Sequence, residues 1–430
     1  MKCKLVKYLF ILWILSGTIN SCSYTQSSSL PPKWEEGMLD VHTINTGRGN
    51  CQYIVLPDGT TMMIDAGDFD KTKYKEQYYP MTCAEDLPDT KHSAAEVIAN
   101  YISKIKSGEN SQIDYFLLTH FHSDHFGCIK EGIDRKDGTS YYLNGVTELH
   151  EYIPIKQIID RSYPDYDYPV PLYGRKNKDG SDYDPNVDNY IDFVHQNVAQ
   201  GTMVASSLSV GSDKQFVLVN HPSGYPEFKI TGIKKNDELW TGPKGGVISL
   251  FDSNQVSSKG LKVKENQLSC AIVLEYGSFR YYAGGDNSGL VDQDHDEYLD
   301  IESVMAPVIG KVSAMSLNHH GNRDGSNLNF LNMLDPKIVL LQTWSSDQPG
   351  EEVGHRLISK NVGTRERDIF ATWYCPQSGQ GKGPWFEREI KAKNGHILLR
   401  VYPDKHYEVF ILDATSNVPN IIEHYGPYSD

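Results

Sequence analysis

Short apolar runs separated by turns dominate the start of the chain. Residues 38–44, 51–56 and 61–64 are mostly apolar, and a Pro-Asp-Gly turn separates the second run from the third. This pattern predicts a meander of three β-strands that ends at Asp65. Residues 92–105 then carry apolar side chains at helical spacing, which predicts a helix before the next strand.

The rest of the chain alternates predicted strands and helices. Residues 113–118 form a nearly continuous apolar run, which is typical of a buried strand. Further strands are predicted at residues 215–220, 228–233, 270–276, 279–283, 313–317 and 337–342, with a closing hairpin at 396–402 and 407–412 and helical segments near Ile301 and Leu328. No linker or repeat divides the chain, so we expect one α/β sandwich domain over residues 38–414 and a C-terminal tail at 415–430.

Two stretches lack the pattern of a core. Residues 69–90 and 135–200 are rich in Tyr, Asp, Pro and Gly, and we expect them to be loop insertions. The second stretch contains a group of tyrosines between residues 163 and 173. These rings either line a binding cleft or pack against one another in a solvated loop.

The N-terminal segment has the pattern of an export signal. Three lysines precede an apolar run at residues 8–15, which is too short to span a bilayer comfortably. The sequence Ile-Asn-Ser-Cys at residues 19–22 resembles the lipobox of bacterial lipoproteins. We therefore expect a signal peptide at residues 1–21, a lipid anchor on Cys22 with a tether at 22–37, and an exported lipoprotein of the bacterial cell envelope, periplasmic or anchored in the outer membrane. Plain secretion is the alternative, and Cys22→Ala would release a lipoprotein from the membrane.

Charge and cysteine content narrow the classes of partner. The formal net charge is −15, and removal of residues 1–21 takes away three lysines and no acid, which leaves −18. An acidic surface repels phosphate backbones, so long nucleic acids are poor partners. No cysteine pair has the spacing of a zinc knuckle, and no protein partner is predicted.

A cluster of metal-binding residue types follows the strand predicted at 113–118. The sequence Thr-His-Phe-His-Ser-Asp-His at residues 119–125 places His120, His122, Asp124 and His125 within six residues. Imidazole and carboxylate groups are ligands that divalent zinc, iron and manganese accept. A tight loop can direct the first two side chains to one ion and the last two to a second ion beside it.

The motif H-x-H-x-D-H resembles that of the metallo-β-lactamase superfamily. The resemblance implies an αββα sandwich, and it implies that Asp65 steadies the histidine loop from behind the metal ligands. It also implies that Asp286, in Ala-Gly-Gly-Asp, bridges two metal ions. In the late motif His319-His320-Gly321, neighbouring side chains at a strand end diverge, so we expect His320 to be a ligand. His319 is then either a catalytic contact to the substrate or a support behind the ligands.

One branch of the superfamily resembles residues 38–412 more closely. The extracellular hydrolase domain of the competence DNA-uptake channel family, ComEC, has a Gly-rich turn like residues 45–50, an Asn-rich turn like that before Ser269, and a His-His-Gly motif. The membrane helices of that channel are absent, so the chain resembles a freestanding relative. Arg48 and Asn50 stand where that branch usually has Gln and Asp, so contacts to substrate are expected to differ.

A third histidine for the first metal is missing from the expected region, residues 265–269. Asn266 is the nearest substitute there, and His221 is an alternative if a loop brings it in. A site poorer in nitrogen makes manganese more plausible beside zinc, the leading expectation for the two ions. Histidines without partner spacing are expected to be ordinary: His42, His150, His195, His295 and His355.

These residues favour a hydrolase that uses a metal-bound hydroxide. Asp124 would hold one ion and orient the water, and His319 or a nearby tyrosine would stabilise or protonate the leaving group. The leading hypothesis is a phosphodiesterase or nuclease-like enzyme of the envelope that acts on a small phosphoester or an oligonucleotide. A lactone, thioester or β-lactam hydrolase is the second hypothesis, and an envelope binding lipoprotein with a vestigial metal site is the third.

Overall fold

A computed structural model describes residues 29–106, 112–252, 263–289, 297–375 and 384–430. The predicted signal peptide and Cys22 lie outside these residues, as does His295. Within the described ranges, no helix is both long enough and apolar enough to cross a membrane.

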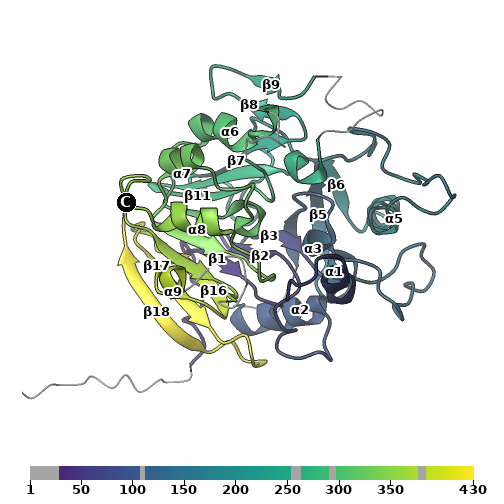
Figure 1. Cartoon of the computed structure of the whole chain (residues 1–430), viewed down its shortest axis with the longest axis horizontal. Coiled ribbons are helices and arrows are strands. Elements are labelled where there is room, and N and C mark those ends of the chain that lie inside the picture. The colour runs from purple at the N-terminus through teal and green to yellow at the C-terminus, as the bar shows by residue number, and fades with distance from the viewer. Residues whose placement is uncertain (1–28, 107–111, 253–262, 290–296, 376–383) are drawn as a thin grey trace, which may run out of the picture.

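The described strands form two nine-stranded sheets (Figure 1). The first sheet has the order β18-β17-β16-β1-β2-β3-β4-β5-β6. Its strands are β1 (Leu39–Thr43), β2 (Cys51–Val55), β3 (Thr61–Ala66), β4 (Ile113–Leu117), β5 (Ile155–Asp160), β6 (Val204–Ser207), β16 (His396–Val401), β17 (Tyr407–Leu412) and β18 (Ile421–Tyr428). The second sheet has the order β15-β14-β13-β12-β11-β10-β7-β8-β9. Its strands are β7 (Phe228–Lys235), β8 (Glu238–Trp240), β9 (Val247–Ser249), β10 (Ala271–Tyr276), β11 (Phe279–Ala283), β12 (Ala314–Ser316), β13 (Ile338–Leu341), β14 (Asp368–Ala371) and β15 (Ile390–Ala392).

Helices cover the outer face of each sheet, which confirms the predicted αββα sandwich. The α-helices are α1 (Lys71–Gln77), α2 (Ala94–Ile105), α3 (Ser123–Phe126), α4 (Gly145–Tyr152), α5 (Pro185–Ala199), α6 (Ile301–Ile309), α7 (Leu328–Leu334), α8 (Glu351–Ile358) and α9 (Pro384–Glu387), and the 3-10 helices are η1 (Glu265–Leu268), η2 (Glu297–Leu299) and η3 (Asn318–Gly321). Helices α2, α4 and α5 pack on the first sheet, and α6 to α9 pack on the second.

The alternation of side chains along each strand builds the layers. In β3, Met62 and Ile64 face the core between the two sheets, whereas Met63 faces the helices. Helix α2 begins where Ser93 and Glu96 form a reciprocal capping box, and it buries Ile98 and Ile102 against the sheet. Because the core has three apolar layers, the strand ends stay fixed relative to one another.

Three regions differ from the sequence-based expectation. The region 135–200, expected to be a loop insertion, contains β5 inside the first sheet and the covering helices α4 and α5. The expected tail at 415–430 contains β18, which pairs with β17. Residues 215–220 are not a strand: Phe216 and Leu218 do enter the core, but backbone groups there bond to side chains such as those of Thr60 and Asp58.

The carboxyl ends of parallel strands point to one edge of the sandwich. β3, β4, β5 and β6 are parallel in the first sheet, and β11 to β15 are parallel in the second. Loops that follow such ends meet at one place, where ligand sites of open α/β sheets form. The histidine loop follows β4, the Asp286 turn follows β11 and the His319–His320 turn follows β12.

Candidate metal centre

The histidine loop is held by Asp65 at the end of β3. Asp65 accepts hydrogen bonds from the backbone N–H of Thr119 at 2.8 Å and from its hydroxyl at 2.9 Å. Oδ2 of Asp65 also lies 2.7 Å from Nδ1 of His125. Asp65 has the positive φ of 60°, a strained conformation that is typical of functional sites. Asp65 therefore lies beside the candidate ligands and contacts the loop at both Thr119 and His125.

Glycines let the loop pack closely on its neighbours. A Cβ at Gly49 would lie 2.3 Å from the carbonyl oxygen of Asp124, and one at Gly67 would lie 1.9 Å from the same atom. Asn50 donates its backbone N–H to that carbonyl at 2.8 Å. The Gly-rich turn at residues 45–50 thus supports the loop that carries Asp124, and a side chain at either glycine would push this loop away.

Asp286 lies at the centre of the cluster. Its Oδ1 is 3.3 Å from Nε2 of His125, and its Oδ2 is 3.4 Å from Nε2 of His320 and 3.7 Å from Nε2 of His120. The preceding Gly285 has φ +56°, and a Cβ there would meet Thr119 at 2.8 Å. The turn after β11 can therefore approach the histidine loop only with glycine at this position.

His319 and His320 both have left-handed backbone angles, with φ of 49° and 54°. His320 donates from Nδ1 to the carbonyl of Gln342 at 3.1 Å, which leaves Nε2 free to act as a ligand 3.0 Å from Asp124. His319 contacts Asp324 through Nδ1 at 2.5 Å and Asn266 through Nε2 at 3.0 Å. This unusual backbone brings both rings near Asp286, since Nε2 of His319 is 3.8 Å from its Oδ2.

Two groups of ligand atoms result. Asp124, His125, Asp286 and His320 each offer an atom, and these atoms lie within 4.8 Å of one another. His120, His122 and Asp286 form a second group under the same limit, with Nε2 of His120 only 3.2 Å from Nδ1 of His122. Asp286 belongs to both groups. The predicted ligands therefore gather in one place, with His319 next to them.

The donor set and two unpaired atoms fit divalent ions. Nε2 of His125 and Oδ1 of Asp286 are buried and have no hydrogen-bond partner among the described residues. These two atoms lie 3.3 Å from each other without a hydrogen bond, although buried polar groups are nearly always paired, and a cation bound by both would satisfy them. Imidazole and carboxylate groups are ligands of zinc, manganese and iron. A bound metal ion would satisfy both atoms.

The pKa shifts of the clustered residues show that the buried carboxylates favour positive charge beside them. Burial alone would lower the pKa of His320, but the charges of Asp286 and Asp124 raise it to about 9. Burial would raise the pKa of Asp124, which His125 and His320 hold at about 2. His120 differs, because burial lowers its pKa well below the usual value, so it is in the neutral form that binds metals. The carboxylates thus attract cations into this pocket.

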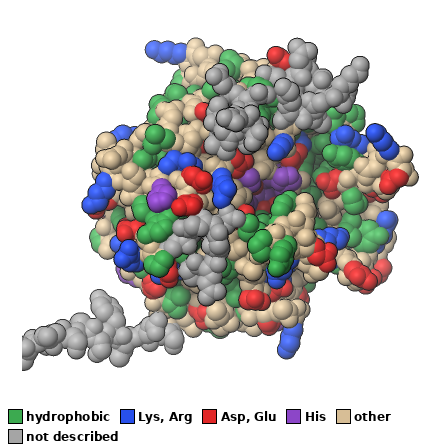
Figure 2. Space-filling view, in the orientation of Figure 1, with side chains coloured by type: hydrophobic (Ala, Val, Ile, Leu, Met, Phe, Trp, Pro, Cys, Tyr) green, Lys and Arg blue, Asp and Glu red, His purple; other side chains and the backbone are tan. Residues whose placement is uncertain are grey.

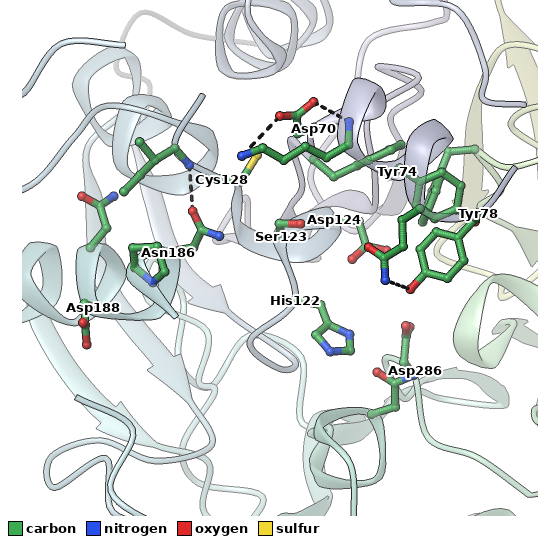
Figure 3. A pocket seen from close by; sticks show the side chains of 18 of the residues that line it. Asp70, Tyr74, Tyr78, His122, Ser123, Asp124, Cys128, Asn186, Asp188 and Asp286 are labelled. Carbon is green, nitrogen blue, oxygen red and sulfur yellow. Dashed lines mark hydrogen bonds and ion pairs between the residues drawn. The ribbon is translucent and has the colours of Figure 1, made fainter. Parts of the chain in front are cut away.

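The cluster forms the floor of a large cleft. Figure 2 shows histidine side chains gathered in a hollow on this face of the molecule. The cleft has a volume of about 1410 Å³, larger than the roughly 300–1,000 Å³ of common small-ligand sites. His122, Asp124 and Asp286 face the cavity together with Tyr74 of α1 and Tyr78, which directly follows that helix (Figure 3).

Several candidate residues lie elsewhere. His221 is more than half exposed and bonds to Glu36 at 2.8 Å, so it does not supply a third nitrogen. Arg48 is buried in an ion pair with Asp86 and does not line the cleft. The histidines expected to be ordinary and described here are outside the cleft: His42, His150, His195 and His355. Of the tyrosine group at residues 163–173, only Tyr173 lines it.

A buried ion pair beside the site was not expected. Arg161 follows β5 and makes two hydrogen bonds to Glu265, of 2.8 and 2.7 Å. Glu265 in turn accepts the backbone N–H of Phe121 at 2.8 Å, between His120 and His122. Only the fold brings these residues together, because Arg161 and Glu265 are 104 positions apart in the chain. Asp324 is different: it lies five residues beyond His319, and a search for a nearby carboxylate partner would have found it.

Two layered sheets between helices, with a His/Asp cluster at the strand ends, define the metallo-β-lactamase fold. Residues 44–196 match the family model described as the Metallo-beta-lactamase superfamily. The matched segment includes Asp65 and the histidine loop, and it ends before Asp286. No curated protein matches the chain.

Solved structures with a related arrangement differ widely in sequence. The diiron beta-hydroxylase CmlA from Streptomyces venezuelae is 13% identical over 72% of this chain, with a TM-score of 0.33, and the match spans 45% of CmlA. Unliganded yeast PDE1 is 10% identical over 77% of this chain and 97% of its own, with a TM-score of 0.34. Zn(2+)-bound PqqB from Methylobacterium extorquens is 12% identical over 84% of this chain and 99% of its own, with a TM-score of 0.32. The chain spans about half the length of CmlA, and likenesses at this level carry no argument about substrate or metal.

Proposed function

We propose that this protein is a metal-dependent hydrolase that cleaves a phosphodiester in the cleft above Asp286. The observation that carries the proposal is the pair of ligand groups that share Asp286, with two buried ligand atoms that lack a partner. Two adjacent divalent ions would acidify a water and polarise a phosphoryl oxygen, which suits an in-line displacement. The ComEC-like motifs at residues 45–50 and 319–321 support a phosphoester over a carbonyl substrate.

The chain's own residues supply position and proton transfer. Asp124 lines the cleft and is fixed by His320, so its carboxylate can orient a water from one side. His319 also lines the cleft, and Asp324 holds its Nδ1 so that Nε2 points toward Asp286. We infer that His319, when both ring nitrogens carry a proton, gives its Nε2 proton to the leaving oxygen in place of its 3.0 Å contact with the side-chain nitrogen of Asn266. The net charge of −15 favours a small phosphodiester over long nucleic acid.

Turnover of bis-p-nitrophenyl phosphate by the protein loaded with zinc or manganese tests the proposal. Asp124→Asn keeps the shape and removes a charge, so we expect kcat to fall at least about a hundredfold with little change in KM. His319→Ala is expected to act more weakly, and His320→Ala should also lower the metal content. His355→Ala is the matched control, because this histidine stacks on Trp385 outside the cleft.

Two results would reject the proposal. One is a metal-loaded protein that hydrolyses no phosphodiester. The other is near wild-type turnover of every phosphodiester by Asp124→Asn. A lactone and a β-lactam belong in the same assay, since hydrolysis of these alone would move the assignment to a carbonyl substrate. If nothing is hydrolysed, a binding lipoprotein becomes the better hypothesis.

A further inference from the structure

One wall of the cleft is built from aromatic rings that run outward from the metal centre. The ring of His320 lies 5.5 Å from that of Trp344, and Trp344 lies 4.9 Å from Tyr74. Tyr74 lies 4.7 Å from Tyr78, and Phe69 backs Trp344 at 4.1 Å. We call Phe69, Trp344, Tyr74 and Tyr78 the aromatic wall, and all four line the cleft.

The rings of the wall are held in place, and the outermost one is open to solvent. The Tyr74 hydroxyl lies 3.0 Å from Oγ of Ser345, and Gln77 donates to the Tyr78 hydroxyl at 3.0 Å. Trp344 is 7% exposed, whereas Tyr78 is 48% exposed. Figure 3 shows Tyr74 and Tyr78 on the side of the cavity that also holds Asp124. Tyr78 is backed by the ring of Tyr74 and half-exposed beside the metal centre, so it is suited to stacking, because little conformational freedom is lost on binding.

The other side of the cleft is polar and acidic. Its lining includes Asn186, Asp188, Asn189 and Asp192 of α5, and Asp182 just before that helix. Among the described residues that line this side, the three carboxylates outnumber the one cation, Arg135, which lies over the ring of Tyr142. Carboxylates in this arrangement repel a second phosphate, so a substrate that extends along the cleft is expected to carry only the phosphate held at the metals. A neutral planar group is therefore the part that gains from contact with the wall.

We propose that the aromatic wall is a subsite that stacks a nucleobase attached to a single phosphoester at the metal centre. This subsite rests on the proposed function, and it narrows the substrate to a nucleoside-type phosphoester. Stacking of a base on an aromatic side chain strengthens binding by about tenfold in typical cases and tolerates any base, because every base has a π-face. The phosphate meets the ligand cluster while the base lies over Tyr78.

Calorimetry with two matched probes tests the subsite without relying on turnover. Thymidine 5′-monophosphate and 2-deoxyribose 5-phosphate share the sugar and the phosphate and differ only in the base. On the protein loaded with zinc or manganese, we expect the first probe to bind about tenfold more tightly. Tyr78→Ala should abolish most of this preference, and Tyr78→Phe should keep it.

Two controls separate stacking from other effects. Tyr79 is 88% exposed and does not line the cleft, so Tyr79→Ala should leave the preference unchanged. Tyr78→Leu keeps an apolar side chain at the end of α1 but removes the plane, so it should behave like Tyr78→Ala even if the alanine variant loosens that helix.

The outcomes distinguish this inference from the proposed function. Equal affinity of the two probes overturns the subsite, as does a preference that survives in both Tyr78→Ala and Tyr78→Leu. An absence of phosphodiester turnover rejects the proposed reaction, but it leaves the measured preference for a base intact. Turnover together with equal probe affinities retains the reaction and rejects the nucleobase.

Discussion

His396 shows how one buried side chain ties the fold to pH. It begins β16, is 3% exposed, and accepts the backbone N–H of Asn45 at 3.0 Å. Burial lowers its pKa from 6.5 to about 3. The native state therefore keeps this ring neutral, and a proton taken up by the unfolded chain favours unfolding. The contribution of His396 to stability is complete above pH 6.5 and is lost as the pH falls toward 3.

We predict that acidification from pH 7 to pH 5 costs the wild type about 2 kcal/mol of unfolding free energy through His396 alone. His396→Gln keeps an acceptor for Asn45 and removes the titration, so the variant should lose correspondingly less. Urea unfolding of the chelated protein at both pH values measures the difference. His221→Gln, an exposed control, should lose as much as the wild type. Identical losses in wild type and His396→Gln would refute this account.

The residue types of the metal centre were readable in the sequence, and their partners were not. The spacing of His120, His122, Asp124 and His125 points to metal ligands because few other roles need four such groups together. The argument that neighbouring histidines diverge assumed an extended backbone. The left-handed angles at His319 and His320 instead let both rings approach Asp286.

At the scale of elements, Glu302 joins α6 to the turn that carries the two histidines. It is fully buried, and its carboxylate accepts the side-chain amide of Asn318 at 2.8 Å and the backbone N–H groups of Ser326 and Asn327 at 2.5 and 2.6 Å. One carboxylate therefore holds both ends of the strained turn. All three partners are donors, so the ionised acid satisfies them fully.

Glu302→Gln should loosen this turn, because the amide places donors against donors. We expect a loss of about 1–3 kcal/mol in unfolding free energy, together with lower metal content. Burial raises the pKa of Glu302 to about 7, so urea unfolding and elemental analysis belong at pH 8, where the acid is ionised. Glu351→Gln on the surface of α8 is the control. Unchanged stability and metal content in the Glu302 variant would show that the turn keeps its conformation without this carboxylate.

Helices and strands with a clear repeat of apolar residues were predictable from the sequence, and elements that depend on contacts with distant segments were not. The apolar spacing of α2 gave its position within two residues, and the hairpin of β16 and β17 followed from two late strand-like runs. β5 was missed because it lies between polar segments rich in Tyr and Asp. Residues 215–220 have strand-like composition, but their backbone bonds to side chains of the β2–β3 turn region, which local pattern does not reveal.

At the scale of the whole molecule, two sheets bring distant segments to one edge. The ligands come from loops after β4, β11 and β12, and the aromatic wall joins α1 to the loop after β13. Strand ends were predictable one by one, but their meeting depends on sheet order, which includes the crossover that places β16 beside β1. The layered architecture followed from the family resemblance, whereas the cleft wall needed the folded structure.

Metal removal should therefore lower the stability of the whole molecule. Ions that bind only the native state stabilise it by mass action, by about 4 kcal/mol when the free metal exceeds its Kd a thousandfold. We expect chelation to lower Tm by several degrees and added zinc or manganese to restore it. Asp286→Ala removes the carboxylate that both ligand groups share, so its Tm should respond far less to added metal. Asp404→Ala, at an exposed turn, should respond like the wild type. Equal melting of chelated and metal-loaded protein, or full metal stabilisation of Asp286→Ala, would mean that this cluster is not the site at which metal binding and folding are coupled.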